Sequence, residues 1–281
     1  MGIIGVDLGG TNVRAGLIEN NSLVNVESIP ITKTMNAMDV VDDITNLIER
    51  LSASEIDGIG VGVPSVVDVE KGIVYDVQNI PSWKEVPLKK LLEAKLHVPV
   101  YVNNDANCFA IGEKYFGKGK DHDNVVGLIV GTGLGAGIII NSKLYAGRNC
   151  GAGEFGCVAY RDKNYEYYCS GQFFTNVYHT TGEELFEKAK RGDKEAVRIF
   201  SEFGANLGQA IKLIMYTIDP EIIILGGSVS KSFEMFKNDM YRSVKDFAYP
   251  KSVDNLVVKV SEVDNVAILG AAALYYDGTR I

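Results

Sequence analysis

The sequence predicts an α/β protein, and two observations lead to this fold class. Short apolar runs typical of buried strands alternate with longer segments in which apolar residues recur at helical spacing. Two glycine-rich turns, at residues 8–11 and 131–135, each join two apolar strands and lie about half the chain apart. This internal similarity predicts two lobes of similar plan, although two short hairpins can also agree by chance.

The first part of the chain supplies the first hairpin and its neighbours. Residues 3–7 and 13–18 are predicted strands joined by the glycine-rich bend. Residues 40–51 carry apolar side chains at helical spacing and predict a helix. Residues 59–63 form an apolar run that stops at Pro64, and we expect a buried strand there.

A polar triplet and the second hairpin follow. A predicted strand at residues 98–102 leads into the triplet at 103–105, and a helix is expected at 106–115. The second hairpin has its strands at residues 125–130 and 136–140.

The last part of the chain is rich in helices. Residues 185–191 and 195–217 are predicted helices, the second with one apolar face. Pro220 interrupts the pattern, residues 221–225 predict a buried strand, and the last helix is expected at 266–276.

The composition excludes several classes of function. Acidic residues outnumber basic ones by 36 to 28, giving a net charge of -8, which argues against a nucleic-acid-binding surface. No apolar run approaches the ~20 residues of a membrane span. Residues 1–7 lack the basic region of a signal peptide, so we expect a cytoplasmic protein without nucleic-acid or membrane partners.

The four cysteines, Cys108, Cys150, Cys157 and Cys169, have no C-x-x-C spacing. They therefore predict neither a zinc ribbon nor a redox pair. We expect reduced, buried thiols.

The turn at residues 7–11 suits phosphate binding. Its glycines let backbone N–H groups approach phosphate oxygens, Thr11 adds a hydroxyl, and Asp7 can hold Mg²⁺ through water. A tight hairpin without any ligand explains the same glycines equally well. The second turn at residues 131–135 favours two turns that hold one phosphate chain. Neither turn is a P-loop, which needs Gly-Lys-Ser/Thr at the start of a helix.

The triplet Asn103-Asn104-Asp105 stands between a strand and a helix. Helix capping is the commoner use of such residues there. A general base at the carboxyl end of a strand is the functional alternative, because α/β proteins place their sites at that edge.

Two carboxylates and a glycine pair complete the candidate residues. Glu154 and Glu166 can each accept hydrogen bonds from sugar hydroxyls, whereas an exposed loop charge is the simpler explanation. Gly226 and Gly227 follow a strand and would let a flat base lie against the backbone, or would only form a turn.

Taken in order, these motifs resemble the ROK (repressor, open reading frame, kinase) family of bacterial sugar kinases, within the actin-like ATPase superfamily. The resemblance covers nearly the whole chain. Residues 7–11 and 131–133 resemble the family's two phosphate turns, and residues 60–64 its sugar-proximal loop. Residues 104–107 resemble the Asn-Asp pair that binds sugar, and residues 219–227 the adenosine-side segment.

The resemblance implies a two-lobed actin-like ATPase (ribonuclease H-like) fold with a central cleft. It places a small lobe at residues 1–104 plus 265–281 and a large lobe at 105–264. The implied activity is ATP-dependent phosphorylation of a hexose at its 6-hydroxyl, with Mg²⁺ and with Asp105 as the base. A homodimer is a further expectation from the resemblance.

The same resemblance assigns the site residues. The sugar-binding residues are Asn104, Asp105, Glu154 and Glu166. The ATP-binding residues are Asp7, Gly9, Gly10, Thr11, Asn12, Thr132, Gly133, Gly226 and Gly227.

One departure concerns zinc. Relatives carry a Cys-rich zinc loop and a Glu-x-Gly-His motif. Here Glu154 keeps the motif's sugar glutamate, Cys157 stands at the His, and the Cys-rich run is missing, although residues 166–171 resemble the segment that follows it. We therefore expect no structural zinc and altered sugar selection, because a thiol is shorter than imidazole and a weaker donor.

Two other functions remain alternatives. A sugar-responsive repressor would need a helix-turn-helix module, and the phosphate turn begins at residue 7, which leaves no room for one. The lost His motivates a sugar-binding regulatory protein without catalysis, but the intact Asp105 argues against it. The sequence does not determine the sugar, so an N-acetylated hexosamine or fructose is an alternative to glucose.

Overall fold

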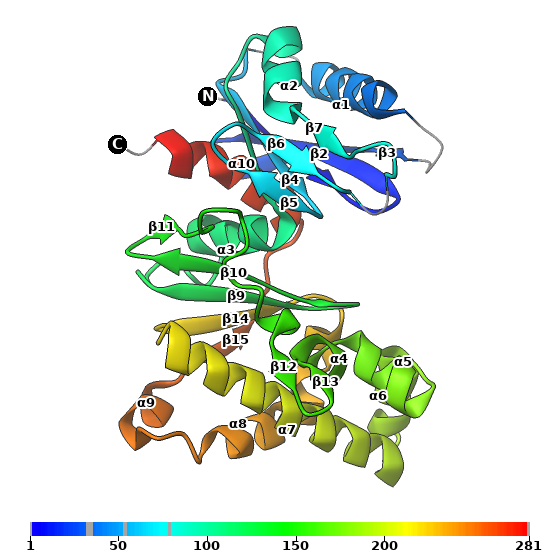
Figure 1. Cartoon of the computed structure of the whole chain (residues 1–281), viewed down its shortest axis with the longest axis vertical. Coiled ribbons are helices and arrows are strands. Elements are labelled where there is room, and N and C mark those ends of the chain that lie inside the picture. Colours follow the sequence, from blue (N-terminus) through cyan, green and yellow to red (C-terminus); the bar gives the residue numbers. More distant parts are fainter. Residues whose placement is uncertain (1, 32–35, 53–54, 78–79, 280–281) are drawn as a thin grey trace. The chain divides into compact units, whose positions relative to one another are not determined.

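The computed structural model describes residues 2–31, 36–52, 55–77 and 80–279. Internal contacts divide the chain into two compact units, and Figure 1 labels their helices and strands. The first unit comprises Met1–Asp121, Gly137–Ala152 and Glu262–Ile281, and the second comprises His122–Ala136 and Gly153–Ser261.

A five-stranded sheet with the order β3-β2-β1-β4-β8 forms the centre of the first unit. Its strands are β1 (Gly2–Leu8), β2 (Asn12–Glu19), β3 (Ser22–Pro30), β4 (Gly58–Val63) and β8 (Val100–Asn104). β1 and β3 are antiparallel to β2, whereas β4 is parallel to both β1 and β8. The carboxyl ends of β1, β4 and β8 therefore share one edge, where ligands of α/β sheets bind.

Four helices surround this sheet: α1 (Ala37–Leu51), α2 (Leu88–Leu96), α3 (Asp105–Phe116) and α10 (Val266–Thr279). α10 lies very close to the sheet, because a Cβ on Gly60 of β4 would be only 1.7 Å from the carbonyl oxygen of Ala271. Glycine is required there by close backbone approach. Three short strands, β5 (Val66–Asp68), β6 (Ile73–Tyr75) and β7 (Glu85–Val86), form a separate small sheet.

The second unit contains three parallel neighbouring strands, β9 (Val125–Val130), β14 (Ile222–Gly226) and β15 (Val258–Val260). β10 (Leu134–Ile140) begins in this unit and continues into the first, where it pairs with β11 (Lys143–Leu144). The remaining elements are η1 (Phe155–Cys157), β12 (Ala159–Tyr160), β13 (Lys163–Asn164), α4 (Tyr165–Cys169), α5 (Gly171–Tyr178), α6 (Gly182–Lys190), α7 (Lys194–Thr217), η2 (Val229–Ser232), α8 (Phe233–Val244) and α9 (Pro250–Asn255).

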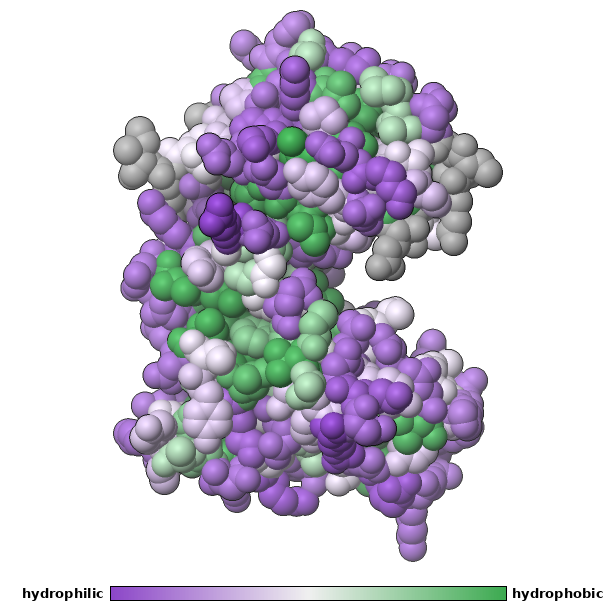
Figure 2. Space-filling view, viewed as in Figure 1, coloured by the Kyte–Doolittle hydropathy of each residue, from purple (hydrophilic) through white to green (hydrophobic). Residues whose placement is uncertain are grey.

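A cluster of phenylalanines forms much of the core of the second unit. Phe203 of α7 lies between Phe174 of α5 and Phe236 of α8, with ring centroids 5.0 and 5.1 Å away. Figure 2 shows mainly hydrophilic residues over α7 and α8 on the face in view, as expected for helices that turn their apolar sides inward.

Every strand and helix named from the sequence is present; β9 has the predicted ends, and the other elements have shifted ends. β8 begins at Val100 rather than residue 98, because the unpredicted α2 ends at Leu96 and His97 adopts a left-handed conformation as its C-cap. β10 begins at Leu134, within the stretch assigned to the second glycine-rich turn. The sequence pattern did not reveal β3, the small β5-β6-β7 sheet, α4, α5, α8, α9 or β15.

The boundaries between the two compact units fall at other residues than the boundaries between the predicted lobes. The lobe boundaries remain a prediction. α3 belongs to the first unit, because a Cβ on its Gly112 would lie 3.0 Å from the Cα of Gly270 in α10. Met1, Arg280 and Ile281, at the ends of the predicted small lobe, lie outside the described residues.

Two expectations from the composition can be compared with the structure. Cys108, Cys150 and Cys169 are buried as expected, whereas Cys157 is exposed, so the prediction was wrong for that thiol. In the described part of the chain, no helix has both the length and the apolar character that a membrane span requires.

Candidate active site

The first glycine-rich turn joins β1 to β2 in a tight hairpin. The backbone N–H of Gly9 donates to the carbonyl oxygen of Asn12 at 2.9 Å, and Asn12 Nδ2 donates to Thr11 Oγ1 at 3.0 Å. Gly10, Thr11 and Asn12 are exposed, so an anion can approach the turn. The structure thus places these predicted phosphate contacts side by side.

Asp7 precedes this turn on β1 and is half-buried. It lies opposite Arg14 of β2 in the antiparallel register. Burial raises the pKa of Asp7, and the positive charge of Arg14 opposes part of that increase. A nearby divalent cation would favour the ionised carboxylate, so Asp7 fits the predicted role toward Mg²⁺.

Asn104 and Asp105 form the junction between β8 and α3. Asn104 is the N-cap: its Oδ1 accepts the N–H of Ala106 at 2.9 Å, and its Nδ2 donates to the carbonyl oxygen of Ser65 at 3.2 Å. Asp105 is the first helical residue, half-buried, and its Oδ1 also accepts the N–H of Ala106, at 2.8 Å. The capping interpretation therefore holds for Asn104, while Asp105 stands beside the cap.

Asp7 and Asp105 lie near one another at the carboxyl edge of the first sheet. In the sheet, Asp7 of β1 pairs with Gly62 of β4, which in turn pairs with Asn103 of β8. Two strand spacings, roughly 10 Å, therefore separate Asp7 from Asn103. Burial raises the pKa of the Cys108 thiol well above its usual value, and the charges of Asp105 and Asp7 raise it further. Both predicted carboxylates thus act on one buried thiol.

A buried polar cluster supports this junction. Asn103 Oδ1 accepts the N–H of Asn104 at 2.8 Å, Asn107 Nδ2 at 2.9 Å and the Cys150 thiol at 3.2 Å. Cys150 thereby fastens the segment before Gly151 to the strand end that carries Asn104. Sequence reasoning missed this role, because Cys150 lies 47 residues from Asn103 along the chain.

The second glycine-rich turn is held by Glu166 of α4. The N–H of Gly131 donates to the carbonyl oxygen of Gly133 at 3.0 Å, and Glu166 Oε2 accepts the N–H of Leu134, also at 3.0 Å. A Cβ on Gly133 would lie 2.6 Å from Glu166 Oε2, so a larger residue there would displace this carboxylate oxygen. Glu166 Oε1 accepts from Gln172 Nε2 at 3.0 Å. Both oxygens of this predicted sugar ligand thus already contact the protein.

The N-terminus of α5 closes the other side of this turn. The N–H of Gly171 donates to the carbonyl oxygen of Gly131 at 2.7 Å. The Ser170 hydroxyl donates to the carbonyl oxygen of Thr132 at 3.1 Å. A pocket of about 210 Å³ lies here. Its lining residues are Gly131, Thr132, Gly171, Gln172, Thr175, Gly182, Ser228 and Val229. The N–H groups of Gly171 and Gln172 already have protein acceptors, so the dipole of α5 is what would favour the anionic part of a nucleotide here.

Gly226 and Gly227 lie next to the same turn. Gly226 ends β14 opposite Ile129 of β9. Gly227 has a φ of 83°, and a Cβ there would lie 2.4 Å from the carbonyl oxygen of Val130. The sequence assigns an adenosine contact to this glycine pair. The structure brings the pair to the second predicted phosphate turn. Ser228 and Val229, which line the pocket, were not predicted.

Glu154 and Cys157 contact each other at η1. Both are exposed, and the Cys157 thiol lies 3.6 Å from Glu154 Oε2. Partial desolvation raises the pKa of Cys157, and the negative charges of Glu154 and Glu166 raise it further, which keeps the thiol protonated. Among the described residues, no group of three or more His, Cys, Asp or Glu side chains is placed to hold a metal ion. The expected lack of structural zinc remains a prediction.

A cluster of aromatic rings and one arginine, which we call the tyrosine clip, holds the segment between Cys157 and Glu166. Tyr160 stacks on Tyr165 at 4.4 Å and meets Tyr168 edge-on at 5.7 Å. The Arg161 guanidinium lies 5.3 Å from the Tyr160 ring and 5.1 Å from the Tyr168 ring. The clip thus fixes the short β12-β13 hairpin against α4, which carries Glu166.

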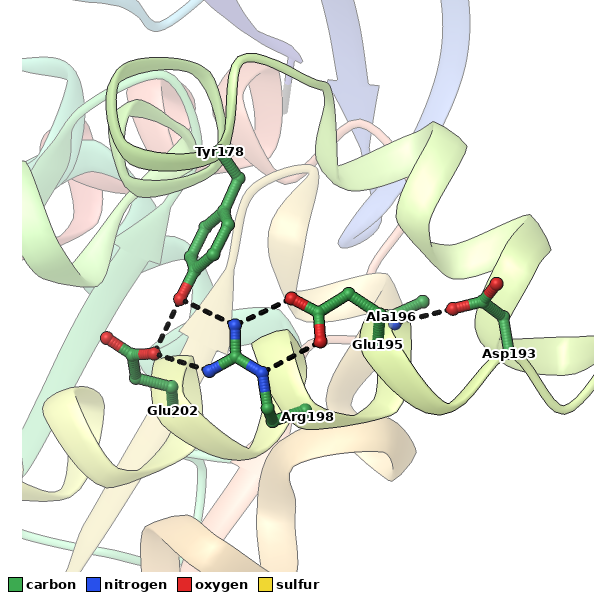
Figure 3. Close-up of polar contacts among 6 residues, drawn as sticks. All are labelled: Tyr178, Asp193, Glu195, Ala196, Arg198 and Glu202. Carbon is green, nitrogen blue, oxygen red and sulfur yellow. Dashed lines mark hydrogen bonds and ion pairs between the residues drawn. The ribbon is translucent and has the colours of Figure 1, made fainter.

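The far end of α5 is tied to α7 by the polar contacts in Figure 3. The Tyr178 hydroxyl donates to Glu202 Oε2 at 2.6 Å, and Arg198 pairs with both Glu195 and Glu202. The Asp193 side chain caps α7 by accepting the N–H of Ala196 at 2.9 Å. These contacts orient α5, whose other end borders the pocket beside Thr132.

Comparison with known proteins identifies the family. The model of the ROK family matches residues 3–277. The chain belongs to the ROK family. It is 31% identical to the glucokinase of Thermotoga maritima, over 97% of this chain and 96% of the relative. It is also 31% identical to the N-acetyl-D-glucosamine kinase of Vibrio parahaemolyticus, over 96% and 98%.

A solved structure gives the fold of this ROK protein. A ROK family glucokinase from Streptomyces griseus, in complex with glucose and AMPPNP, superimposes with a TM-score of 0.79 at 28% identity, over 98% of this chain and 99% of that one. The structural neighbours of this chain include ROK sugar kinases, which have the actin-like ATPase fold, so the predicted family and fold class are confirmed. The residue assignments remain predictions.

Proposed function

We propose that this ROK protein transfers the γ-phosphoryl group of ATP to the 6-hydroxyl of a hexose, with Asp105 as general base. The observation that carries the proposal is the position of Asp105. It is the first residue of α3, half-buried at the carboxyl end of a parallel strand, one residue beyond a cap that anchors it. The glucokinase names of the relatives support the reaction class.

The chemistry needs one proton acceptor and many positioning contacts. Asp105 takes the proton of the sugar hydroxyl as that oxygen bonds to the γ-phosphorus and the bond to ADP breaks. Asn104, whose side chain is held by Ala106 and Ser65, would fix the sugar beside it. Glu154 would accept from ring hydroxyls, and Glu166 would do so through its remaining lone pairs.

The nucleotide would be held by backbone donors rather than by basic side chains. The first turn offers exposed residues 10–12, and the second turn and the N-terminus of α5 border the 210 Å³ pocket. Mg²⁺ would neutralise phosphate charge, and Asp7 would hold it through water. Elevated pKa values at functional carboxylates are common, and Asp7 has one.

The names of the relatives suggest which sugars could be the acceptor. The relatives include both glucokinases and N-acetylglucosamine kinases, so glucose and an N-acetylated hexosamine are the leading candidates, with fructose as the third. A cytoplasmic location, a homodimer and the lack of nucleic-acid or membrane partners remain predictions from the sequence.

A coupled assay of ADP release over a panel of hexoses and N-acetylhexosamines tests the function. We expect turnover with at least one sugar, dependent on ATP and Mg²⁺, at a rate of about 1–100 per second, as is typical of kinases. Sugar binding without turnover across the panel would instead support a regulatory sugar-binding protein.

A further inference from the structure

The first unit has a hollow of its own, lined by none of the residues to which we assign a role in catalysis or in sugar or ATP binding. Its volume is about 640 Å³, within the range of small-molecule pockets. One wall is formed by residues 66–70 together with Tyr75, and the other by residues 147–149. All of these residues belong to the first unit, so the hollow is complete within it.

Both walls of this hollow are anchored to the asparagine pair that we expect at the sugar. Ser65, one residue before the first wall, accepts a hydrogen bond from Asn104 Nδ2 at 3.2 Å. Cys150, one residue after the second wall, donates its thiol to Asn103 Oδ1 at 3.2 Å. Each wall of the hollow is therefore one residue away from a group that bonds the asparagine pair.

The lining has the mixture of groups that sugars require. Val66 and Val69 are 51% and 39% exposed and offer apolar surface for the C–H face of a ring. Among the described residues, the Arg148 side chain is exposed and has no hydrogen-bond or ion-pair partner, so its donors are available. Glu70 supplies a carboxylate acceptor on the facing wall, and Asp68 beside it is paired with Lys71 at 3.3 Å.

We propose that this hollow binds a second, neutral sugar ring, so that the acceptor is a disaccharide or glycoside whose non-reducing ring lies at Asp105. This inference rests on the proposed kinase function and names its substrate class. A volume of 640 Å³ is far larger than a single acetamido group needs. Asp68 is paired with Lys71, so Glu70 and Arg148 leave the hollow close to neutral, which suits ring hydroxyls that can use both kinds of group.

The experiment compares glucose with cellobiose and maltose as acceptors, in the wild type and three variants. Val66→Trp fills the hollow, and Arg148→Ala removes its free cation. Val24→Trp is the matched control, because Val24 is a comparably exposed valine (53%) on β3, away from the hollow. The measured quantity is kcat/KM for each acceptor, and melting temperatures identify any variant that fails to fold.

For at least one disaccharide, we expect the kcat/KM of the wild type to equal or exceed its kcat/KM for glucose. Val66→Trp should lower kcat/KM for that disaccharide at least tenfold and Arg148→Ala several-fold, with glucose within threefold of wild type. Unchanged disaccharide kinetics in both variants, or an equal loss for glucose, would overturn the proposal. If Val66→Trp does not fold, Arg148→Ala alone decides.

A binding measurement separates this inference from the proposed function. If the wild type phosphorylates no sugar, the kinase proposal fails, and calorimetric titration of glucose and both disaccharides then tests the hollow. Tighter binding of a disaccharide than of glucose, lost in Val66→Trp and kept in Val24→Trp, would support the second-ring site. Equal affinities for glucose and the disaccharides would refute it.

Discussion

Glu166 accepts a hydrogen bond from the backbone N–H of Leu134, the residue that follows the second glycine-rich turn, at 3.0 Å. A carboxylate predicted to contact sugar is thus bound directly to a turn predicted to contact phosphate. With both assignments, this pair would link the sugar and the nucleotide through residues of the second unit. Any movement of Glu166 toward a sugar hydroxyl is therefore coupled to the conformation of the turn.

The first prediction concerns Glu166. Glu166→Gln keeps an acceptor for Leu134 but loses the charge, so the KM for sugar should rise about tenfold, the value of one charge-assisted hydrogen bond. The KM for ATP should stay within about twofold. Glu166→Ala leaves the N–H of Leu134 without its partner and should raise both KM values. Wild-type sugar KM in both variants would contradict the assignment.

The sequence predicted the elements of the site better than their connections. The glycine turns and the strand ahead of Asp105 were recognisable, because glycine pairs and apolar runs are local signals. The contact between Glu166 and Leu134 spans 32 residues and depends on α4 and α5. These two helices are short and rich in polar and aromatic residues, so their sequence pattern did not predict them. Cys150 was missed for the same reason, since its bond to Asn103 spans 47 residues.

The second prediction concerns Asp7 and pH. Its folded-state pKa lies above the ordinary value of 3.8, so the folded state favours the protonated form. Ionised Asp7 therefore destabilises the protein increasingly as pH rises from the unfolded through the folded pKa. Asp7→Asn should be more stable than wild type at neutral pH, with the difference vanishing near pH 3. Thermal melts across that range measure it.

Asp7→Asn should also lower kcat about 10²-fold, because a carboxylate that helps to hold Mg²⁺ is lost. Asp121→Asn, a change at an exposed aspartate, is the control and should alter neither property. If Asp7→Asn is less stable than wild type at pH 7, the burial argument is wrong. If it keeps full activity, the Mg²⁺ role is wrong.

The third prediction is that the active enzyme contains no structural zinc and that Cys157 alters sugar selection. Elemental analysis of protein purified without added metal should find far less than one zinc per chain. Cys157→His restores an imidazole beside Glu154 and should change the ratio of kcat/KM between glucose and N-acetylglucosamine several-fold. Stoichiometric zinc whose removal abolishes activity would contradict the prediction about zinc. An unchanged ratio of kcat/KM between the two sugars would contradict the prediction about Cys157.

The fourth prediction concerns the tyrosine clip. Arg161→Ala removes two cation–π contacts, each worth about 0.5–1 kcal/mol at an exposed site, so the melting temperature should fall by roughly 2–6 °C. The KM for sugar should rise because the segment carrying Glu166 is loosened. Arg161→Lys keeps the charge and should recover most of both effects. A lower melting temperature with wild-type KM would show that the clip is structural only.

The central claim is that Asp105 takes the proton, and Asp105→Asn tests it most directly. The amide has the same shape but cannot accept the proton, and a general base typically contributes about 10²–10⁴-fold. We predict a loss of kcat of that size, with the calorimetric Kd for sugar within an order of magnitude of wild type. Turnover within a few-fold of wild type would contradict the account.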